Sequence, residues 1–187
     1  MPFPRAQIDQ LLETASNGAT AQIRGNALEQ AAAAMLGSVP GIFPPVTNVI
    51  DYAIAGEIDI LFPNLAPRNG LWFLDRAFLC ECKNWNIRVG SEEIRVFADR
   101  MRERNCRDGI LIASQGITGD AATLTAANHQ VARALELGRE IIVLDWVDLN
   151  AIRSARALVA RVQQKWIQLK SFRTSVDQLQ KMSAPRP

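Results

Sequence analysis

Acidic and basic side chains alternate with apolar residues in two short segments of this chain. In GEIDILF (residues 56–62), strand alternation puts Asp59 on the face opposite to the two isoleucines and the phenylalanine. In FLCECK (residues 78–83), the same alternation puts Glu81 and Lys83 together on one face. Burying such charges costs several kcal/mol each unless they pair with one another or bind a cation. The two segments therefore predict a buried ion pair or a cation site.

The balance of charge in these segments favours the cation. Glu57, Asp59 and Glu81 are three carboxylates, and Lys83 is the one basic residue among them, so negative charge is left over. A hard divalent cation would neutralise this charge, and oxygen ligands suit Mg²⁺. Glu57 stands at the start of its segment, where exposure to solvent is the simpler expectation. Ordinary ion pairs on a half-exposed sheet are the alternative interpretation.

Asp59 followed by Glu81-Cys82-Lys83 resembles the catalytic signature of the PD-(D/E)xK nuclease superfamily. RGNALE (residues 24–29) is similar to the Gly-x-x-x-Glu helix motif of many members, and the two strand segments are most similar to Mrr-type restriction endonucleases. The resemblance covers residues 19–145. Two features depart from the pattern: an isoleucine replaces the proline before Asp59, and no Gln-x-x-x-Tyr follows Lys83. The second departure argues against the RecB-like exonucleases.

The resemblance implies a role for each of five residues. Asp59 and Glu81 would bind Mg²⁺, for which Mn²⁺ can substitute, with the backbone carbonyl of Cys82 as a further ligand. Glu29, one helix away, would complete the metal site, although a glutamate on a helix is also commonly solvated or ion-paired. Lys83 would orient or deprotonate the attacking water and stabilise the charge that develops on the phosphorus oxygens. This is the chemistry of metal-assisted phosphodiester hydrolysis.

Four further residues are expected to contact nucleic acid. Ser114 and Gln115 follow a predicted strand, where this superfamily often places groups that face the substrate. Trp85 and Arg88 follow the Glu-x-Lys segment closely and could contact a base or the DNA backbone. A buried anchor in the core is the alternative for Trp85.

The elements that must position these residues follow from hydrophobic periodicity and from Gly and Pro punctuation. Helices are expected at 5–15, 20–36, 91–105, 120–137 and over the tail, and strands at 46–53, 56–62, 71–74, 77–83, 109–113 and 141–144. Strands that alternate with helices in the second half imply parallel pairing, whereas the earlier strands could form a meander. We predict an α/β, restriction-endonuclease-like three-layer sandwich with a central mixed sheet, core order αβββαβ, plus a C-terminal helix.

Charge is divided unevenly along the 187 residues. Residues 151–187 contain eight lysines and arginines against one aspartate, a net +7, so the total of +2 leaves −5 on residues 1–150. We expect a nuclease-like domain over 1–150 and a basic amphipathic helical extension over 151–187. Its stripe follows 3,4 spacing through Ala155, Leu158, Val162, Lys165, Leu169, Phe172, Val176 and Leu179. The stripe is expected to dock on the body or on a second subunit, with the basic face turned to DNA or simply solvated.

Several classes of protein are set aside by the composition. The N-terminus lacks the basic start and apolar run of a signal peptide, and no apolar stretch near it could span a bilayer. Cys80, Cys82 and Cys106 cannot all pair within the chain, so we expect reduced thiols and a cytoplasmic location. With His129 as the single histidine, a His-rich zinc site is not expected. Strand alternation predicts that Cys80 and Cys82 pack in the core instead of binding metal.

Together these features predict a Mg²⁺-dependent DNA endonuclease of the restriction or defence type, with no membrane association. Cutting both strands of a duplex needs two active sites, so a homodimer is expected. A Holliday-junction resolvase or DNA-repair nuclease that acts on branched DNA would use the same residues. A non-catalytic nucleic-acid-binding module on a nuclease fold is a third possibility, against which the intact set of Asp59, Glu81 and Lys83 argues.

Overall fold

The computed structural model describes residues 2–51 and 56–174, and for 46–51 and 56–59 it describes the backbone without the side chains. The helices within these residues are α1 (Arg5–Asn17), α2 (Ala21–Gly37), α3 (Ser91–Glu103), α4 (Ala126–Glu136), α5 (Trp146–Ala151) and α6 (Ala155–Phe172). The strands are β1 (Val46–Asp51), β2 (Gly56–Pro63), β3 (Ala77–Lys83), β4 (Asp108–Ala113) and β5 (Glu140–Leu144). The predicted core order, one helix, three strands, a helix and a strand, is confirmed from α2 to β4.

The strands form one mixed sheet in the order β1-β2-β3-β4-β5. β1, β2 and β3 are antiparallel neighbours, whereas β3, β4 and β5 run parallel and are joined by α3 and α4. Both parallel connections need a crossover, which a helix supplies. β4 and β5 are buried along their whole length, as the apolar runs at residues 109–113 and 141–144 predict, and each begins with a buried acidic residue, Asp108 or Glu140.

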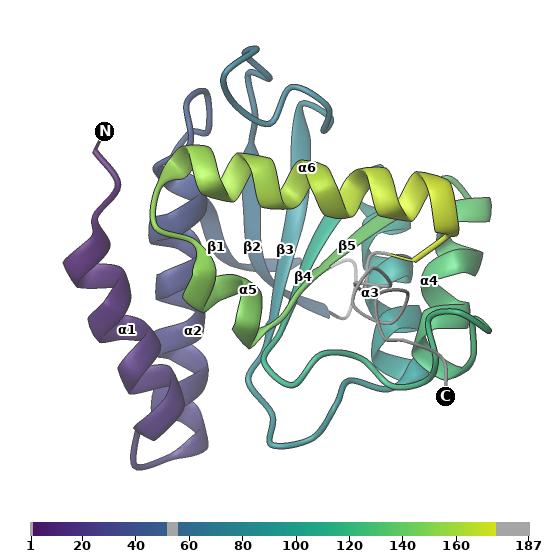
Figure 1. Cartoon of the computed structure of the whole chain (residues 1–187), viewed down its shortest axis with the longest axis horizontal. Coiled ribbons are helices and arrows are strands. Elements are labelled where there is room, and N and C mark those ends of the chain that lie inside the picture. Colours follow the sequence, from purple (N-terminus) through teal and green to yellow (C-terminus); the bar gives the residue numbers. More distant parts are fainter. Residues whose placement is uncertain (1, 52–55, 175–187) are drawn as a thin grey trace, which may run out of the picture.

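Helices cover both faces of the sheet, so the predicted three-layer sandwich is confirmed (Figure 1). Phe78 and Cys80 of β3 pack in a core with α1, α2, α5 and the first half of α6. Leu79, which projects from the opposite face, packs in a second core with α3 and α4. The period-two alternation of β3 thus decides which side chain meets which helix layer.

Two predicted elements are wrong in extent or type. Residues 71–74 form a turn and not a strand, because the side-chain amide of Asn64 donates to the carbonyls of Leu71 (2.9 Å) and Asp75 (3.0 Å). Side-chain bonds of this kind give the backbone an alternative to strand pairing. The helix expected from residue 120 begins at Ala126. Asp120 Oδ1 instead accepts from the backbone N–H groups of residues 122 and 123 and holds the preceding segment in a turn.

The helix expected over the tail is preceded by a separate short helix, α5, which ends at Ala151, and both α5 and α6 pack on the body. The Ser154 hydroxyl accepts from the N–H of Ala157 and begins α6. The predicted stripe is buried at Leu158, Val162, Lys165 and Leu169, whereas Phe172 is 49% exposed. Val176 and Leu179 lie outside the described residues. Figure 1 shows α6 crossing the front of the sheet, so the described part of the stripe docks on the chain's own body.

Two buried carboxylates, Asp148 of α5 and Glu140 of β5, hold α6 in place. Lys165, only 2% exposed, lies 2.9 Å from Asp148 of α5, which Arg161 also contacts. The carboxylate of Glu140 on β5 accepts from Trp166 Nε1 (2.7 Å) and pairs with Lys170. Two basic residues of the tail therefore neutralise the otherwise unpaired buried charge of Asp148. None of the helices in the described residues is long and apolar enough to cross a membrane.

Candidate active site

Glu81 and Lys83 lie side by side near the carboxyl end of β3. The Nζ of Lys83 is 2.7 Å from Oε1 of Glu81, and Glu81 is 4% exposed. They share the face of β3 that carries Leu79, because alternate residues of a strand project from the same face. Lys83 is less buried than its partner, so its ammonium group lies where the sheet meets solvent. The structure brings this predicted pair together.

A second cation, Arg100 of α3, binds the same carboxylate. Its Nη1 donates to Oε1 (2.9 Å) and to Oε2 (2.7 Å) of Glu81. Charge-assisted hydrogen bonds of this length are among the stronger ones in proteins. Arg100 is not among the residues predicted from the sequence. The sequence does contain one signal for Arg100. It directly precedes Met101, which is buried on the apolar face of the helix that follows the Glu-x-Lys segment.

Arg100 changes the balance of charge at this site. Glu57, Asp59 and Glu81 outnumber Lys83 by two charges, and a second cation reduces the excess of negative charge to one. Glu81 itself already contacts two cations, Lys83 and Arg100. A bound metal ion would therefore share Glu81 with these groups or displace one of them.

Asp59 occupies the neighbouring position of the adjacent strand. Ile60 of β2 pairs with Cys80 of β3, and Leu61 with Leu79, in antiparallel register. Asp59 immediately precedes Ile60 and Glu81 immediately follows Cys80, so the backbones of the two acidic residues come together in the sheet. The side chains of Asp59 and Glu57 lie outside the described residues.

Glu29 and the side chain of Cys82 belong to the side of the sheet opposite to the side chain of Glu81. Glu29 is half-buried on α2, and α2 covers the sheet face that carries Cys80, opposite to that of Glu81. Cys82 lies between Glu81 and Lys83, and its side chain packs against the same core as α2. Among the side chains that the structure describes, no three His, Cys, Asp or Glu lie close enough together to hold a metal ion.

The prediction that Cys80 packs in the core is confirmed. Cys80 and Cys106 are buried free thiols, and Cys82 is half-buried. His129 is exposed on α4. Burial is the largest influence on Cys106 and raises the pKa of its thiol, which favours the unreactive protonated form.

The four residues expected to contact nucleic acid lie at the carboxyl ends of β3 and β4. Trp85 is 38% exposed, so it is not the buried anchor considered as an alternative. Its ring centroid is 5.6 Å from Nζ of Lys83, within range of a cation–π contact. Ser114 is buried and donates to the carbonyl of Trp85 (3.1 Å), whereas Arg88 and Gln115 are exposed. Trp85, Ser114 and Gln115 line one pocket.

Comparison with known proteins identifies the family. The model of the Mrr_cat restriction endonuclease family matches residues 21–151, which extend from α2 to α5 and contain all five strands. The chain belongs to the Mrr_cat restriction endonuclease family. It is therefore a restriction-endonuclease-like nuclease domain, with α1 and α6 outside the matched segment. No curated protein matches the chain.

The segment that the family model matches contains the residues of the candidate site. The Mrr_cat segment contains Glu81, Lys83 and Arg100, together with the backbone position of Asp59. The element order that the restriction endonuclease resemblance implied is the order observed. The fold prediction is thus confirmed independently by the topology and by the family.

Proposed function

We propose that this chain is a Mg²⁺-dependent DNA endonuclease that hydrolyses phosphodiester bonds, and that Mn²⁺ can replace Mg²⁺. The observation that carries the proposal is the buried Glu81–Lys83 pair at the end of β3, in a chain of the restriction endonuclease family. A carboxylate and an ammonium group two residues apart on one strand face place a metal ligand beside a cation.

The residues fit a magnesium ion by their donor chemistry. Mg²⁺ prefers carboxylate, carbonyl and water oxygens. Asp59 and Glu81, on adjacent strands, would hold the ion with the carbonyl of Cys82, and Glu29 would extend the site. A bound Mg²⁺ polarises a phosphoryl oxygen and lowers the pKa of a coordinated water.

Lys83 and Arg100 supply the positive charge beside the metal ligand in this proposal. Glu81 fixes the ammonium group of Lys83 at 2.7 Å, so Lys83 is held ready to orient the attacking water and to stabilise negative charge on the phosphorane oxygens. Arg100 reaches Glu81 from α3 and sets the orientation of its carboxylate. Arg100 is therefore a positioning residue, since it acts through Glu81.

Cleavage of both strands would need two copies of the chain, because each chain supplies one Glu81–Lys83 pair. We propose a homodimer acting on double-stranded DNA. Supercoiled plasmid should pass directly to the linear form at high enzyme concentration and accumulate as nicked circles on dilution. Preferential cutting of a four-way junction over a matched linear duplex would instead indicate a resolvase.

Cleavage by Lys83→Gln tests the proposed chemistry. Removal of a group that transfers a proton or stabilises transition-state charge typically slows a reaction 10²–10⁴-fold, so we expect at least a hundredfold slower single-turnover cleavage in Mg²⁺. Lys170→Gln is the matched control, because Lys170 is also ion-paired but lies on α6 beside Glu140. Equal cleavage rates for wild type and Lys83→Gln would refute the assignment.

A further inference from the structure

A small polar pocket opens next to the proposed active site, at the edge of the sheet where β3 and β4 end. Its volume is about 90 Å³, and its lining includes Arg24, Asn84, Trp85, Asn86, Ser114 and Gln115. Asn84 directly follows Lys83, and the backbone N–H of Ser114 donates to the carbonyl of Lys83 (3.0 Å). The pocket wall is thus a continuation of the strand that carries Glu81 and Lys83.

Hydrogen bonds within the chain fix the walls of this pocket. The side-chain amide of Asn84 donates to the carbonyls of Ala15 (2.7 Å) and Arg24 (2.9 Å), which ties the end of β3 to α1 and α2. The hydroxyl of Ser114 donates to the carbonyl of Trp85. These bonds occupy the inner polar groups, so the pocket is formed before any ligand arrives.

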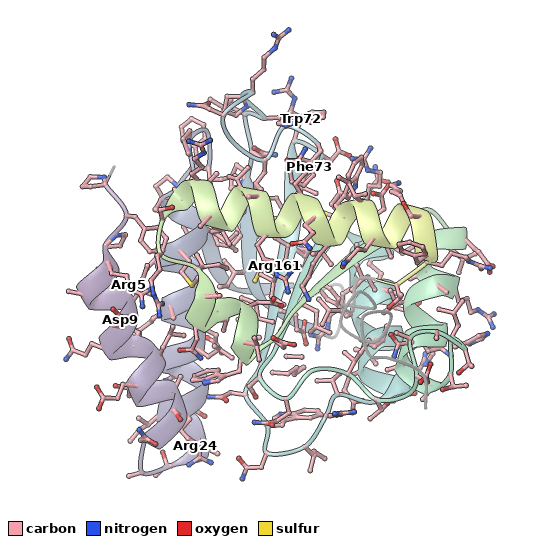
Figure 2. The ribbon with its side chains drawn as sticks, in the orientation of Figure 1. Arg5, Asp9, Arg24, Trp72, Phe73 and Arg161 are labelled. Atoms are coloured by element: carbon pink, nitrogen blue, oxygen red, sulfur yellow. The ribbon has the colours of Figure 1, made fainter. Side chains whose placement is uncertain are left out.

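Arg24 gives the pocket its charge. Among the described residues that line the pocket, Arg24 is the one that is charged. Its Nη1 donates to the carbonyl of Gly18 (3.0 Å), and no carboxylate partner is found for it among the side chains of residues 2–45 and 60–174. A guanidinium group has five N–H donors, so most of them stay available. Figure 2 shows Arg24 at the end of the α1–α2 pair, far from Trp72 and Phe73 at the opposite edge.

Size and chemistry together select the ligand. The volume of about 90 Å³ is far below the 300–1,000 Å³ typical of pockets for larger organic ligands, so the pocket suits a small group such as a phosphate. Arginine and the amides of Asn and Gln are typical donors to DNA phosphates, and the exposed residues Asn86 and Gln115 line the pocket together with Arg24.

We propose that this pocket binds a backbone phosphate of the DNA strand, adjacent to the phosphodiester that is cut at Lys83. The inference rests on the proposed nuclease function for the identity of the ligand. It assigns Arg24 a binding role that is separate from the chemistry at Glu81 and Lys83. The phosphate contact would fix the register of the strand without reading its sequence.

Salt-dependent binding of a fluorescein-labelled DNA duplex in EDTA tests the pocket, since no cleavage occurs under these conditions. Loss of one phosphate contact reduces the slope of log Kobs against log[NaCl] by about 0.9, which is about eightfold in affinity at 0.1 M salt. We expect this change for Arg24→Gln and not for Arg24→Lys, which keeps the charge. Arg68→Gln is the control, because Arg68 is an exposed arginine in the loop at the opposite edge of the sheet. An unchanged slope for Arg24→Gln, or an equal loss for Arg68→Gln, overturns the proposal.

Two further measurements cover the other outcomes. Gln115→Glu changes an exposed side chain and should weaken duplex binding by repulsion even if Arg24→Gln fails to fold; unchanged binding by Gln115→Glu contradicts the proposal. A titration with inorganic phosphate at constant ionic strength separates the sources of the ligand. Phosphate binding together with an unchanged DNA slope in Arg24→Gln would assign the pocket to free phosphate and overturn the DNA contact.

Cleavage assays distinguish failure of the pocket from failure of the nuclease function. Arg24→Gln is compared with wild type in EDTA, where binding is measured without cleavage, and cleavage by wild type in Mg²⁺ is measured separately. A wild type that binds DNA with the expected dependence on Arg24 but never cuts it would refute the nuclease proposal and leave the phosphate pocket standing.

Discussion

Removal of Arg100 separates the structural and functional contributions of the Glu81 cluster. Glu81 is 4% exposed and pairs with both Lys83 and Arg100, whose side chains are each 23% exposed. Breaking a fully buried ion pair costs about 3–5 kcal/mol. Because Lys83 remains and Arg100 is partly solvated, we expect Arg100→Gln to lower the free energy of unfolding by about 1–2 kcal/mol without metal. Urea denaturation at neutral pH in EDTA measures this change.

The same substitution should strengthen metal binding. A like charge about 4 Å from a bound cation is worth at least ~1 kcal/mol even at high dielectric, or about fivefold in affinity. Mn²⁺ calorimetry should therefore show tighter binding by Arg100→Gln than by wild type. Arg95→Gln, on the exposed face of the same helix, should change neither quantity measurably. Lower stability combined with unchanged or weaker Mn²⁺ affinity would refute the view that Arg100 and the metal share Glu81.

Three other perturbations test the packing that supports the site. Lys165→Ala should cost about 2–4 kcal/mol in urea denaturation, because it leaves the buried carboxylate of Asp148 with one cation fewer; a loss below about 0.5 kcal/mol would contradict the docking of α6. Burial raises the pKa of Asp108 despite its bond to Arg107, so its native state holds the proton more tightly than the unfolded chain. The folded state is then destabilised as pH rises from the ordinary aspartate pKa of about 3.9 through the raised value, and the stability of Asp108→Asn relative to wild type should increase over that window; a constant difference would contradict it. Burial also raises the pKa of the Cys106 thiol, so native Cys106 should react with iodoacetamide far more slowly at pH 8 than in urea, as mass spectrometry of the labelled peptides would show; equal rates would contradict its burial.

Local periodicity was sufficient to predict the Glu81–Lys83 pair. Residues two apart on a strand project from the same face whatever the rest of the fold does. The apolar flanks of the segment also predicted that this face would be partly buried. The resemblance implies that Asp59 and Glu81 share one site, and the observed register brings their backbones together on adjacent strands.

Contacts between separate elements could not be predicted in this way. Arg100 reaches Glu81 from a helix that begins ten residues later, and its approach depends on how α3 packs on the sheet. Lys165 was recognised as a polar break in the tail's stripe, but its partner Asp148 lies on a different helix. The prediction of a strand at residues 71–74 was wrong because the side-chain amide of Asn64, seven residues before Leu71, hydrogen-bonds to the Leu71 carbonyl and holds this backbone in a turn.

The most direct test of metal-assisted hydrolysis at Glu81 is the anomalous scattering of Mn²⁺ in crystals of the full chain. A manganese ion coordinated by Glu81 and Asp59, with Lys83 still beside the carboxylate, is the predicted result. Crystals that hold Mn²⁺ elsewhere, with Glu81 still bound only by Lys83 and Arg100, would contradict the proposed function.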